Sequence, residues 1–222
     1  MTSPDRQAEA VAQRLAAESV AAADPTGWFE RLYAGGQGVP WDRGEPHPSL
    51  VQWARGRAIA GRRAIVVGSG HGDDAEFVAG LGYDVVAFDV ARSAVSQAEQ
   101  RFPDSSVRYV VANLLDPPAE WRRAFDLVVE SRTVQSLPDP ARREAATAIA
   151  AMVAPGGTLL VIAAGRDDDG PCDGPPWPLT RAELVRFTDA GLAQVEFTEL
   201  RAAGDVGLNR WVIEYRRPAA TS

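Results

Sequence analysis

Apolar residues along the chain fall into short continuous runs that alternate with longer segments of helical periodicity. The expected strands cover residues 64–67, 107–113, 125–130 and 158–163, with a further strand that ends at Asp89. The expected helices cover residues 92–102, 138–153 and 181–189, with a further helix that carries Ala75, Phe77, Val78 and Leu81. Continuous apolar runs are typical of parallel strands that are buried on both faces. The alternation therefore predicts an α/β fold with a mainly parallel sheet.

The two ends of the chain depart from this alternation. Strands are expected at residues 193–200 and 210–215, and the connection between them favours a hairpin that leaves one strand antiparallel. Near the N-terminus, residues 5–23 form either a short amphipathic helix, which Pro25 and Gly27 would end, or a solvated tail. No internal repeat and no linker suggests a second full domain.

Between these parts lies a segment rich in aromatic residues and interrupted by glycine and proline. It contains Trp28, Phe29, Tyr33, Trp41 and Trp53. A loop this apolar must pack on something, so it is either core padding below the sheet or a lid whose aromatic side chains face a ligand. We favour the lid, because aromatic rims are common in ligand pockets. His47, between two prolines, is expected in a surface loop.

Residues 64–90, AIVVGSGHGDDAEFVAGLGYDVVAFDV, have the order of a nucleotide-binding βαβ unit. Gly68, Gly70 and Gly72 can turn the chain tightly and bring bare backbone against a ligand. Asp89 follows about 20 residues later, where a carboxylate can accept hydrogen bonds from ribose hydroxyls. A dinucleotide site would need a third glycine where Asp73 stands. The spacing G-x-G-x-G favours S-adenosylmethionine, which has no pyrophosphate to place at the helix N-terminus.

The composition excludes several classes of chemistry. The chain has 222 residues, a net charge of −7, no lysine, one cysteine and two histidines. These counts argue against Schiff-base chemistry, a P-loop, a metal cluster and nonspecific binding to nucleic acid or anionic membranes. The N-terminus lacks the pattern of a signal peptide and no apolar run is long enough to span a bilayer, so we expect a cytoplasmic protein.

Four segments together resemble the thiopurine S-methyltransferase group, which includes thiol and halide methyltransferases. WFERLYAGGQGVPWDRGEPHPSL is similar to its W-x3-W…TPWD-x-G-x-P pattern, and VVGSGHGDD to its PGCG-x-G-x-D loop. FDLVVESRTVQSLPDPAR resembles its YD-x-V-(D/E)-R-x-x-L-x-A-L-x-P-x-x-R segment, and GPPWPLTRAELVRF its GPP-aromatic loop. The matches occur in the order of the family and span residues 28 to 187.

The resemblance implies a class I methyltransferase with a Rossmann-like, seven-stranded sheet, mostly parallel with one antiparallel strand, and helices on both faces. It implies an N-terminal helix and aromatic lid over residues 1–57, followed by the methyltransferase domain over residues 58–218. The implied cofactor, S-adenosyl-L-methionine, would contact Tyr33, Trp41, Gly68, Ser69, Gly70, Gly72, Asp74, Asp89, Val90, Asn113, Leu114 and Glu130. Arg132 and Trp177 would lie on the acceptor side, and no metal is expected.

Departures from the family pattern fall mainly on the acceptor side. The arginine that follows the family's acidic residue falls on Ser131, with Arg132 one position later, and Phe29 and Tyr33 replace tryptophans. We expect methyl transfer to a small molecule, most readily a thiol, because a thiol ionises near neutral pH without a base. A phenol or amine would need a base, and Glu130 or His47 would have to serve. Methylation of oxygen or nitrogen and a noncatalytic binding module are the alternatives.

Overall fold

The computed structural model describes residues 3–36, 38–57, 62–167, 174–201 and 209–219. Its centre is one seven-stranded sheet with the order β3-β2-β1-β4-β5-β7-β6. The strands are β1 Arg63–Val67, β2 Asp84–Asp89, β3 Arg108–Val111, β4 Phe125–Ser131, β5 Val153–Gly165, β6 Ala193–Arg201 and β7 Asn209–Arg216. Strand β7 pairs antiparallel with both β5 and β6, whereas the pairs from β3 through β5 are parallel. The predicted fold class, including the single antiparallel strand, is confirmed.

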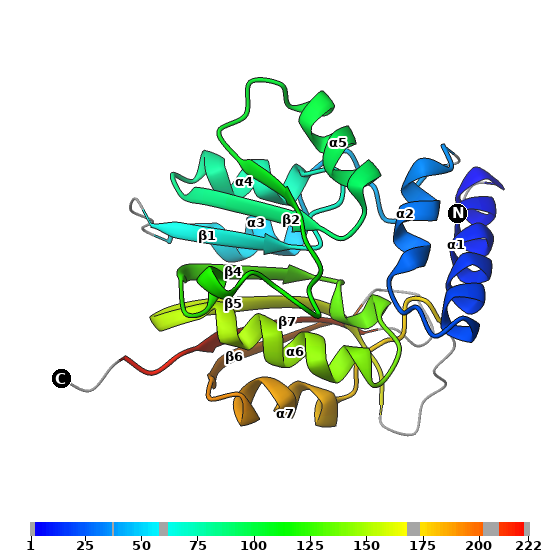
Figure 1. The fold of residues 1–222 in the computed structure, drawn as a ribbon. Helices are drawn as coiled ribbons and strands as arrows, with labels where there is room; N and C mark the ends of the chain where they lie inside the picture. Colours follow the sequence, from blue (N-terminus) through cyan, green and yellow to red (C-terminus); the bar gives the residue numbers. More distant parts are fainter. Residues whose placement is uncertain (1–2, 37, 58–61, 168–173, 202–208, 220–222) are drawn as a thin grey trace.

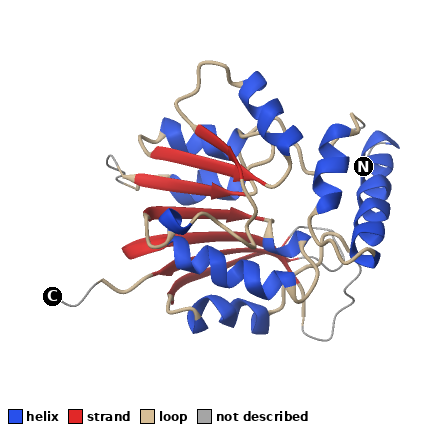
Figure 2. Ribbon diagram, viewed as in Figure 1, coloured by secondary structure: helices blue, strands red, loops and turns tan. Residues whose placement is uncertain are grey.

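Seven α-helices surround this sheet in the described part of the chain (Figures 1 and 2). They are α1 Ser3–Ala21, α2 Gly27–Ala34, α3 Pro48–Ala54, α4 Asp73–Gly80, α5 Arg92–Arg101, α6 Ala141–Met152 and α7 Arg181–Asp189. Helix α7 has the bounds that the sequence predicts, and it begins with a capping box in which Thr180 and Glu183 satisfy each other's backbone N–H groups. Reciprocal capping explains why this boundary can be read from sequence.

The two faces of the sheet carry separate apolar cores. On one face, Leu50 of α3 and Val78 of α4 pack with β-strand residues such as Val66. On the other face, Ile149 of α6 and Phe187 of α7 lie in a larger cluster. The strands alternate their side chains between the faces, so a continuous apolar run feeds both clusters at once. This doubly covered arrangement leaves the carboxyl ends of the parallel strands as the place for a ligand.

Helices α1 and α2 stand at that end of the sheet, where the arrowheads of the parallel strands point in Figure 1. Trp28 is fully buried between them, in a cluster with Leu15 and Leu32, and Phe29 and Trp41 pack against it. Most of residues 5–23 is therefore helical, as one of the two interpretations expects, and the helix ends at Ala21. The aromatic segment contains two helices, α2 and α3, that the pattern did not predict. It forms part of a core and, through Tyr33 and Trp41, part of a cavity wall.

Candidate functional site

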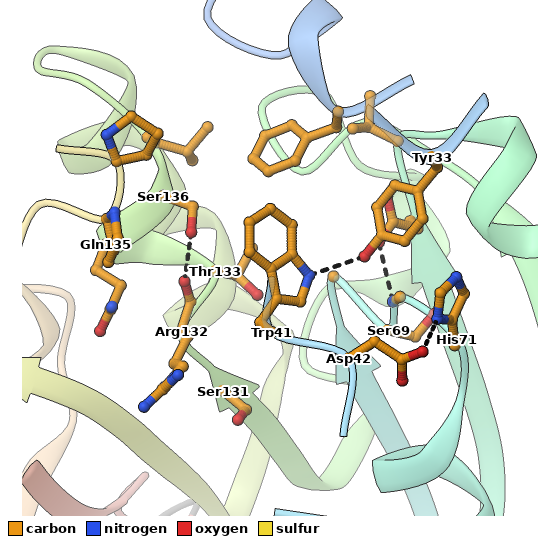
Figure 3. Close-up of a pocket in the computed structure, with 18 of the residues that line it drawn as sticks. Tyr33, Trp41, Asp42, Ser69, His71, Ser131, Arg132, Thr133, Gln135 and Ser136 are labelled. Carbon is orange, nitrogen blue, oxygen red and sulfur yellow. Dashed lines mark hydrogen bonds and ion pairs between the residues drawn. The ribbon is translucent and has the colours of Figure 1, made fainter. Parts of the chain in front are cut away.

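A cavity of about 370 Å³ opens at the carboxyl ends of β1, β2 and β4, beneath the N-terminal helices. Its volume lies in the range typical of small-molecule sites. Eleven of the fourteen residues proposed from the sequence line it: Tyr33, Trp41, Gly68, Ser69, Gly70, Asp74, Asp89, Val90, Asn113, Leu114 and Arg132. Figure 3 shows Trp41 between two groups of labelled lining residues, with Tyr33, Ser69, His71 and Asp42 to its right and Arg132, Gln135 and Ser136 to its left.

The glycine loop that follows β1 has a conformation that side chains would not allow. Gly68 and Gly70 have φ angles of 60° and 52°, in the left-handed region. A Cβ at Gly68 would lie 2.5 Å from Oγ1 of Thr133, and one at Gly70 would lie 2.8 Å from the hydroxyl of Tyr33. The loop thus presents bare backbone to the cavity. The side-chain oxygen of Ser69 is buried in the cavity wall and has no hydrogen-bond partner within the described residues.

Asp89, at the end of β2, fixes the position of this loop. One carboxylate oxygen accepts a hydrogen bond from the backbone N–H of Gly70 at 3.0 Å, and the other accepts from Ala91 at 2.9 Å. Burial raises the pKa of Asp89, and these backbone donors oppose the rise. A carboxylate has about four acceptor positions, so Asp89 retains capacity for ribose hydroxyls on its cavity side. The loop, Asp89 and the unpartnered Ser69 together suit the sugar and amino-acid parts of S-adenosylmethionine.

Next to Asp89, the carboxyl ends of β2 and β3 supply an apolar slot. Val90, Asn113 and Leu114 all line the cavity, and Leu114 is buried. The side-chain oxygen of Asn113 accepts a hydrogen bond from the backbone N–H of Leu115 at 2.9 Å. The amide therefore already closes a local turn, and its oxygen has one further acceptor position for an adenine amino group.

The N-terminal segment is held over the glycine loop by a chain of polar contacts. Trp41 donates from Nε1 to the Tyr33 hydroxyl at 3.0 Å. The His71 imidazole lies 2.9 Å from a carboxylate oxygen of Asp42 and 2.8 Å from the side-chain oxygen of Gln97. Gln97 in turn donates to the backbone carbonyl of Tyr33 at 3.0 Å. His71 therefore links the segment around residue 42 to α5, a role that the sequence interpretation did not give it.

His47 was expected in a surface loop, and this prediction is wrong. The side chain is 6% exposed and lines the cavity, because His47 is the N-cap of α3. Its Nδ1 accepts a hydrogen bond from the backbone N–H of Ser49 at 3.1 Å, which places the proton of the neutral ring on Nε2. Nε2 has no partner among the described residues. Burial, followed by the charges of nearby arginines, lowers the pKa of His47 to about 3.

Asp74 and Arg132 line the cavity with His47 and lie in segments that follow different strands. A carboxylate oxygen of Asp74 accepts a hydrogen bond from the backbone N–H of His47 at 2.6 Å. Burial raises the pKa of Asp74, and hydrogen bonds from His47 and Ser131 oppose the rise. Arg132 follows β4 with a φ of 65°, a left-handed conformation that costs a non-glycine residue about 1–2 kcal/mol. Strain of this kind is common at functional sites.

Three of the proposed residues do not line the cavity. Gly72 is the left-handed N-cap of α4, where a Cβ would meet the Tyr109 hydroxyl. Glu130 is fully buried, and one of its carboxyl oxygens accepts hydrogen bonds from the backbone N–H groups of Thr133 and Val134. Trp177 donates its backbone N–H to the Gln135 carbonyl. Its neighbours Pro175 and Pro176 line the cavity in its place.

Within the described residues, no group of three or more His, Cys, Asp or Glu side chains could hold a metal ion. No helix among the described residues is long and apolar enough to cross a membrane. Cys172 and the run Asp168–Asp169 lie outside the described residues.

The fold and the cavity define a class of protein, and comparison with known proteins agrees with it. Residues 64–157 match a family model described as a methyltransferase domain. The sheet order, the glycine loop and the Asp89 carboxylate are those of a class I S-adenosylmethionine-dependent methyltransferase, and this chain is a member of that class. S-adenosyl-L-methionine is its cofactor.

Relatives of this chain among the known proteins are named for methyl transfer to different atoms. The chain is 26% identical over 162 residues to a probable thiol methyltransferase 2 from Arabidopsis thaliana, covering 72% of this chain and 70% of that protein. It is 32% identical over 126 residues to a ubiquinone biosynthesis O-methyltransferase from Thiobacillus denitrificans. That match covers 55% of this chain and 53% of that protein, so the chain spans about half the length of this relative.

Among solved structures, the chain is similar to one described under the conversion of a disulfide bond into a thioacetal group during echinomycin biosynthesis. The TM-score is 0.72 at 24% identity, over 88% of this chain and 94% of that one. This likeness shows the fold over 88% of the chain.

Proposed function

We propose that this protein transfers the methyl group of S-adenosylmethionine to the sulfur of a small thiol. The cofactor supplies an electrophilic methyl group on a sulfonium when it is bound. The chain's own residues bind and orient it: the glycine loop approaches its amino-acid part, Asp89 accepts from its ribose, and Trp41 and Tyr33 cover it from water. Transfer then depends mainly on alignment and on exclusion of water.

The observation that carries the choice of sulfur is the state of the two residues considered as bases. His47 Nδ1 is occupied by the Ser49 N–H and its pKa is lowered to about 3, so it does not take a proton near neutral pH. Glu130 lies outside the cavity lining, and one of its oxygens binds two backbone N–H groups. A site of this kind suits an acceptor that ionises without the help of a base, and a thiol with a pKa of about 8.5 does so. The name of the Arabidopsis relative supports the same choice.

The test is methyl transfer over a matched set of acceptors at several pH values. We expect turnover of 3-mercapto-1-propanol, with kcat/KM rising with pH as the thiol ionises, and no turnover of 1,3-propanediol or 3-amino-1-propanol. Turnover of the alcohol or the amine at a rate comparable to that of the thiol would refute the assignment to sulfur.

Oxygen methylation is the second candidate, and one observation favours it. Asp74 is a cavity-lining carboxylate whose pKa is raised by burial, which is the direction that suits a base for a phenol. Relatives named as ubiquinone biosynthesis O-methyltransferases match at higher identity over a shorter stretch. The substitution Asp74→Asn separates the two candidate functions. It should abolish methyl transfer to a phenol such as catechol, whereas the kcat/KM for a thiol should still rise with pH as the thiol ionises.

Three further expectations remain proposals beside this function. We propose that residues 1–57 act as a cap and residues 58–218 as the methyltransferase domain, since Tyr33 and Trp41 line the cavity and the Tyr33 hydroxyl lies close to Gly70. We also propose that the cap moves when ligands enter. A cytoplasmic location, where free thiols persist, fits a thiol acceptor.

A further inference from the structure

Positive charge gathers at the end of the cavity away from Asp89. The guanidinium groups of Arg132, Arg210 and Arg43 all lie close enough to the His47 ring to lower its pKa. Arg132 and Arg43 line the cavity, whereas Arg210 lies on β7 outside the cavity lining. The sequence interpretation considered Arg132 alone, because the three arginines lie at least 78 positions apart in the chain.

Arg132 has only like charges beside it in the part of the chain that the structure describes. Its pKa is lowered by burial and then by Arg210 and Arg43, and its guanidinium makes no hydrogen bond or ion pair with a described residue. A partly buried guanidinium costs free energy unless an anion pairs with it. Arg43 is better balanced, since it forms an exposed pair with Glu45 and lies near Asp74. The unmet charge in this region therefore belongs to Arg132.

His47 contributes a second, independent unmet group. Its Nε2 is buried at the cavity wall without a partner among the described residues. The Ser49 N–H on Nδ1 fixes Nε2 as an N–H donor, and a buried donor without an acceptor costs about 1–3 kcal/mol. A guanidinium and a neutral N–H donor can both bind the same kind of group, an acceptor oxygen that carries negative charge.

We propose that the methyl acceptor carries a carboxylate, which binds Arg132 and the Nε2–H of His47 at this end of the cavity. The inference rests on the proposed function, because it describes the acceptor of the same site. A carboxylate has two oxygens that accept a bidentate guanidinium and one further donor, whereas a lone thiolate sulfur offers no such geometry. Asp74 offsets the charge of nearby Arg43, so this end of the cavity keeps only a small net positive charge. That net charge matches the one negative charge of a carboxylate rather than the two of a phosphate.

The first experiment compares two thiols of the same length, 3-mercaptopropionate and 3-mercapto-1-propanol. We expect kcat/KM to favour the carboxylate at least tenfold in the wild-type protein. A nearby carboxylate disfavours formation of the thiolate, so this preference cannot arise from thiol acidity. In Arg132→Gln the ratio of the two kcat/KM values should fall at least tenfold, mainly through the KM for 3-mercaptopropionate.

The matched control is Arg143→Gln, which removes one arginine charge from an exposed position on α6 outside the cavity lining. It should leave the ratio of the two kcat/KM values unchanged. A ratio near one in the wild-type protein, or an equal fall in both variants, would overturn the proposal.

A binding experiment separates failure of this inference from failure of the proposed function. Wild-type protein saturated with S-adenosylhomocysteine should bind butanoate at least tenfold more tightly than 1-butanol, as measured by ligand-observed NMR. If butanoate is preferred but no thiol is methylated, the carboxylate site stands and the assignment to sulfur fails. If thiols are methylated but butanoate and 1-butanol bind equally, the carboxylate site is refuted. This comparison needs no variant, so it decides the question even if Arg132→Gln does not fold.

Discussion

Glu130 provides the sharpest test of the electrostatics in this structure. It lies near the end of β4 and is 0% exposed. One carboxyl oxygen accepts the backbone N–H groups of Thr133 and Val134 at 2.6 and 3.0 Å, and the other is buried without a hydrogen-bond partner in the described residues. Glu130→Gln keeps the shape and the accepting oxygen but removes the ionisation. The substitution therefore isolates the free energy of burying the charge.

The magnitude follows from the pKa. Burial raises the pKa of Glu130 from an ordinary value of 4.5 to about 7, against the two backbone donors. The group loses its proton less readily in the folded state than in the unfolded state. Stability is therefore unaffected below pH 4.5, falls as pH rises toward 7, and then levels off. Each factor of ten in proton affinity is worth about 1.4 kcal/mol, so the loss amounts to about 3 kcal/mol.

The assay is urea unfolding of wild-type protein and Glu130→Gln between pH 4 and 8.5. We expect the difference in the free energy of unfolding to grow by about 3 kcal/mol in favour of the variant across this range. Glu144→Gln, at an exposed position in the first turn of α6, is the matched control and should give a difference that changes little with pH. Parallel pH profiles for wild type and Glu130→Gln would refute the reasoning, since they would mean that the ionised carboxylate is well solvated or paired.

Three other substitutions test the cofactor half and the His47 cap. Asp89→Ala should weaken binding of S-adenosylmethionine by about 1.5–3 kcal/mol in calorimetry, the scale of lost charge-assisted hydrogen bonds; unchanged affinity would remove Asp89 from the site. Gly70→Ala should lower both Tm and cofactor affinity, and Tyr33→Phe in the same chain should restore part of both, because the new Cβ meets the Tyr33 hydroxyl at 2.8 Å. His47→Asn keeps an acceptor for the α3 cap but cannot be protonated. Relative to this variant, the wild type should lose about 2 kcal/mol of stability as pH falls from 6.5 to about 5, because the His47 pKa is about 3 in the folded protein and 6.5 ordinarily. The absence of that loss would show that the ring is solvated.

The fold could be predicted from sequence where a local signal sets each boundary. The apolar runs of β1, β2 and β4 and the capping box of α7 are such signals, and the observed bounds fall close to the expected ones. Helices α2 and α3 were not predicted because glycines and prolines surround them and neither exceeds eight residues. Such short helices gain little from propensity. They are stabilised by tertiary packing, as with fully buried Trp28 and Leu50.

The end of the cavity that contains the glycine loop and Asp89 could be predicted for a similar reason. The glycines and Asp89 lie within one βαβ unit, and the backbone conformation they need is a property of residue type. Glu130 shows where such reasoning stops. Its place at the end of a parallel strand predicts a ligand-facing side chain, but its carboxyl group instead turns to the backbone of the residues that follow β4. Which way a strand-end side chain turns depends on the next loop, and sequence alone does not give that loop's conformation.

The end of the cavity to which we assign the acceptor arises in a different way, and this explains why the sequence predicted only Arg132 there. His47 was placed on the surface because two prolines flank it, yet one of them begins α3 and thereby sets the ring as a buried cap. The charge of Arg132, whose strained backbone follows β4, acts on this ring, and Asp74 at the start of α4 lies near the charge of Arg43. The net charge at this end of the cavity therefore depends on three separate segments that come together only in the folded protein. We predict that a substitution in any one of them changes the preferred acceptor without touching the glycine loop or Asp89, so that proteins of this fold can share a cofactor and differ in their acceptor.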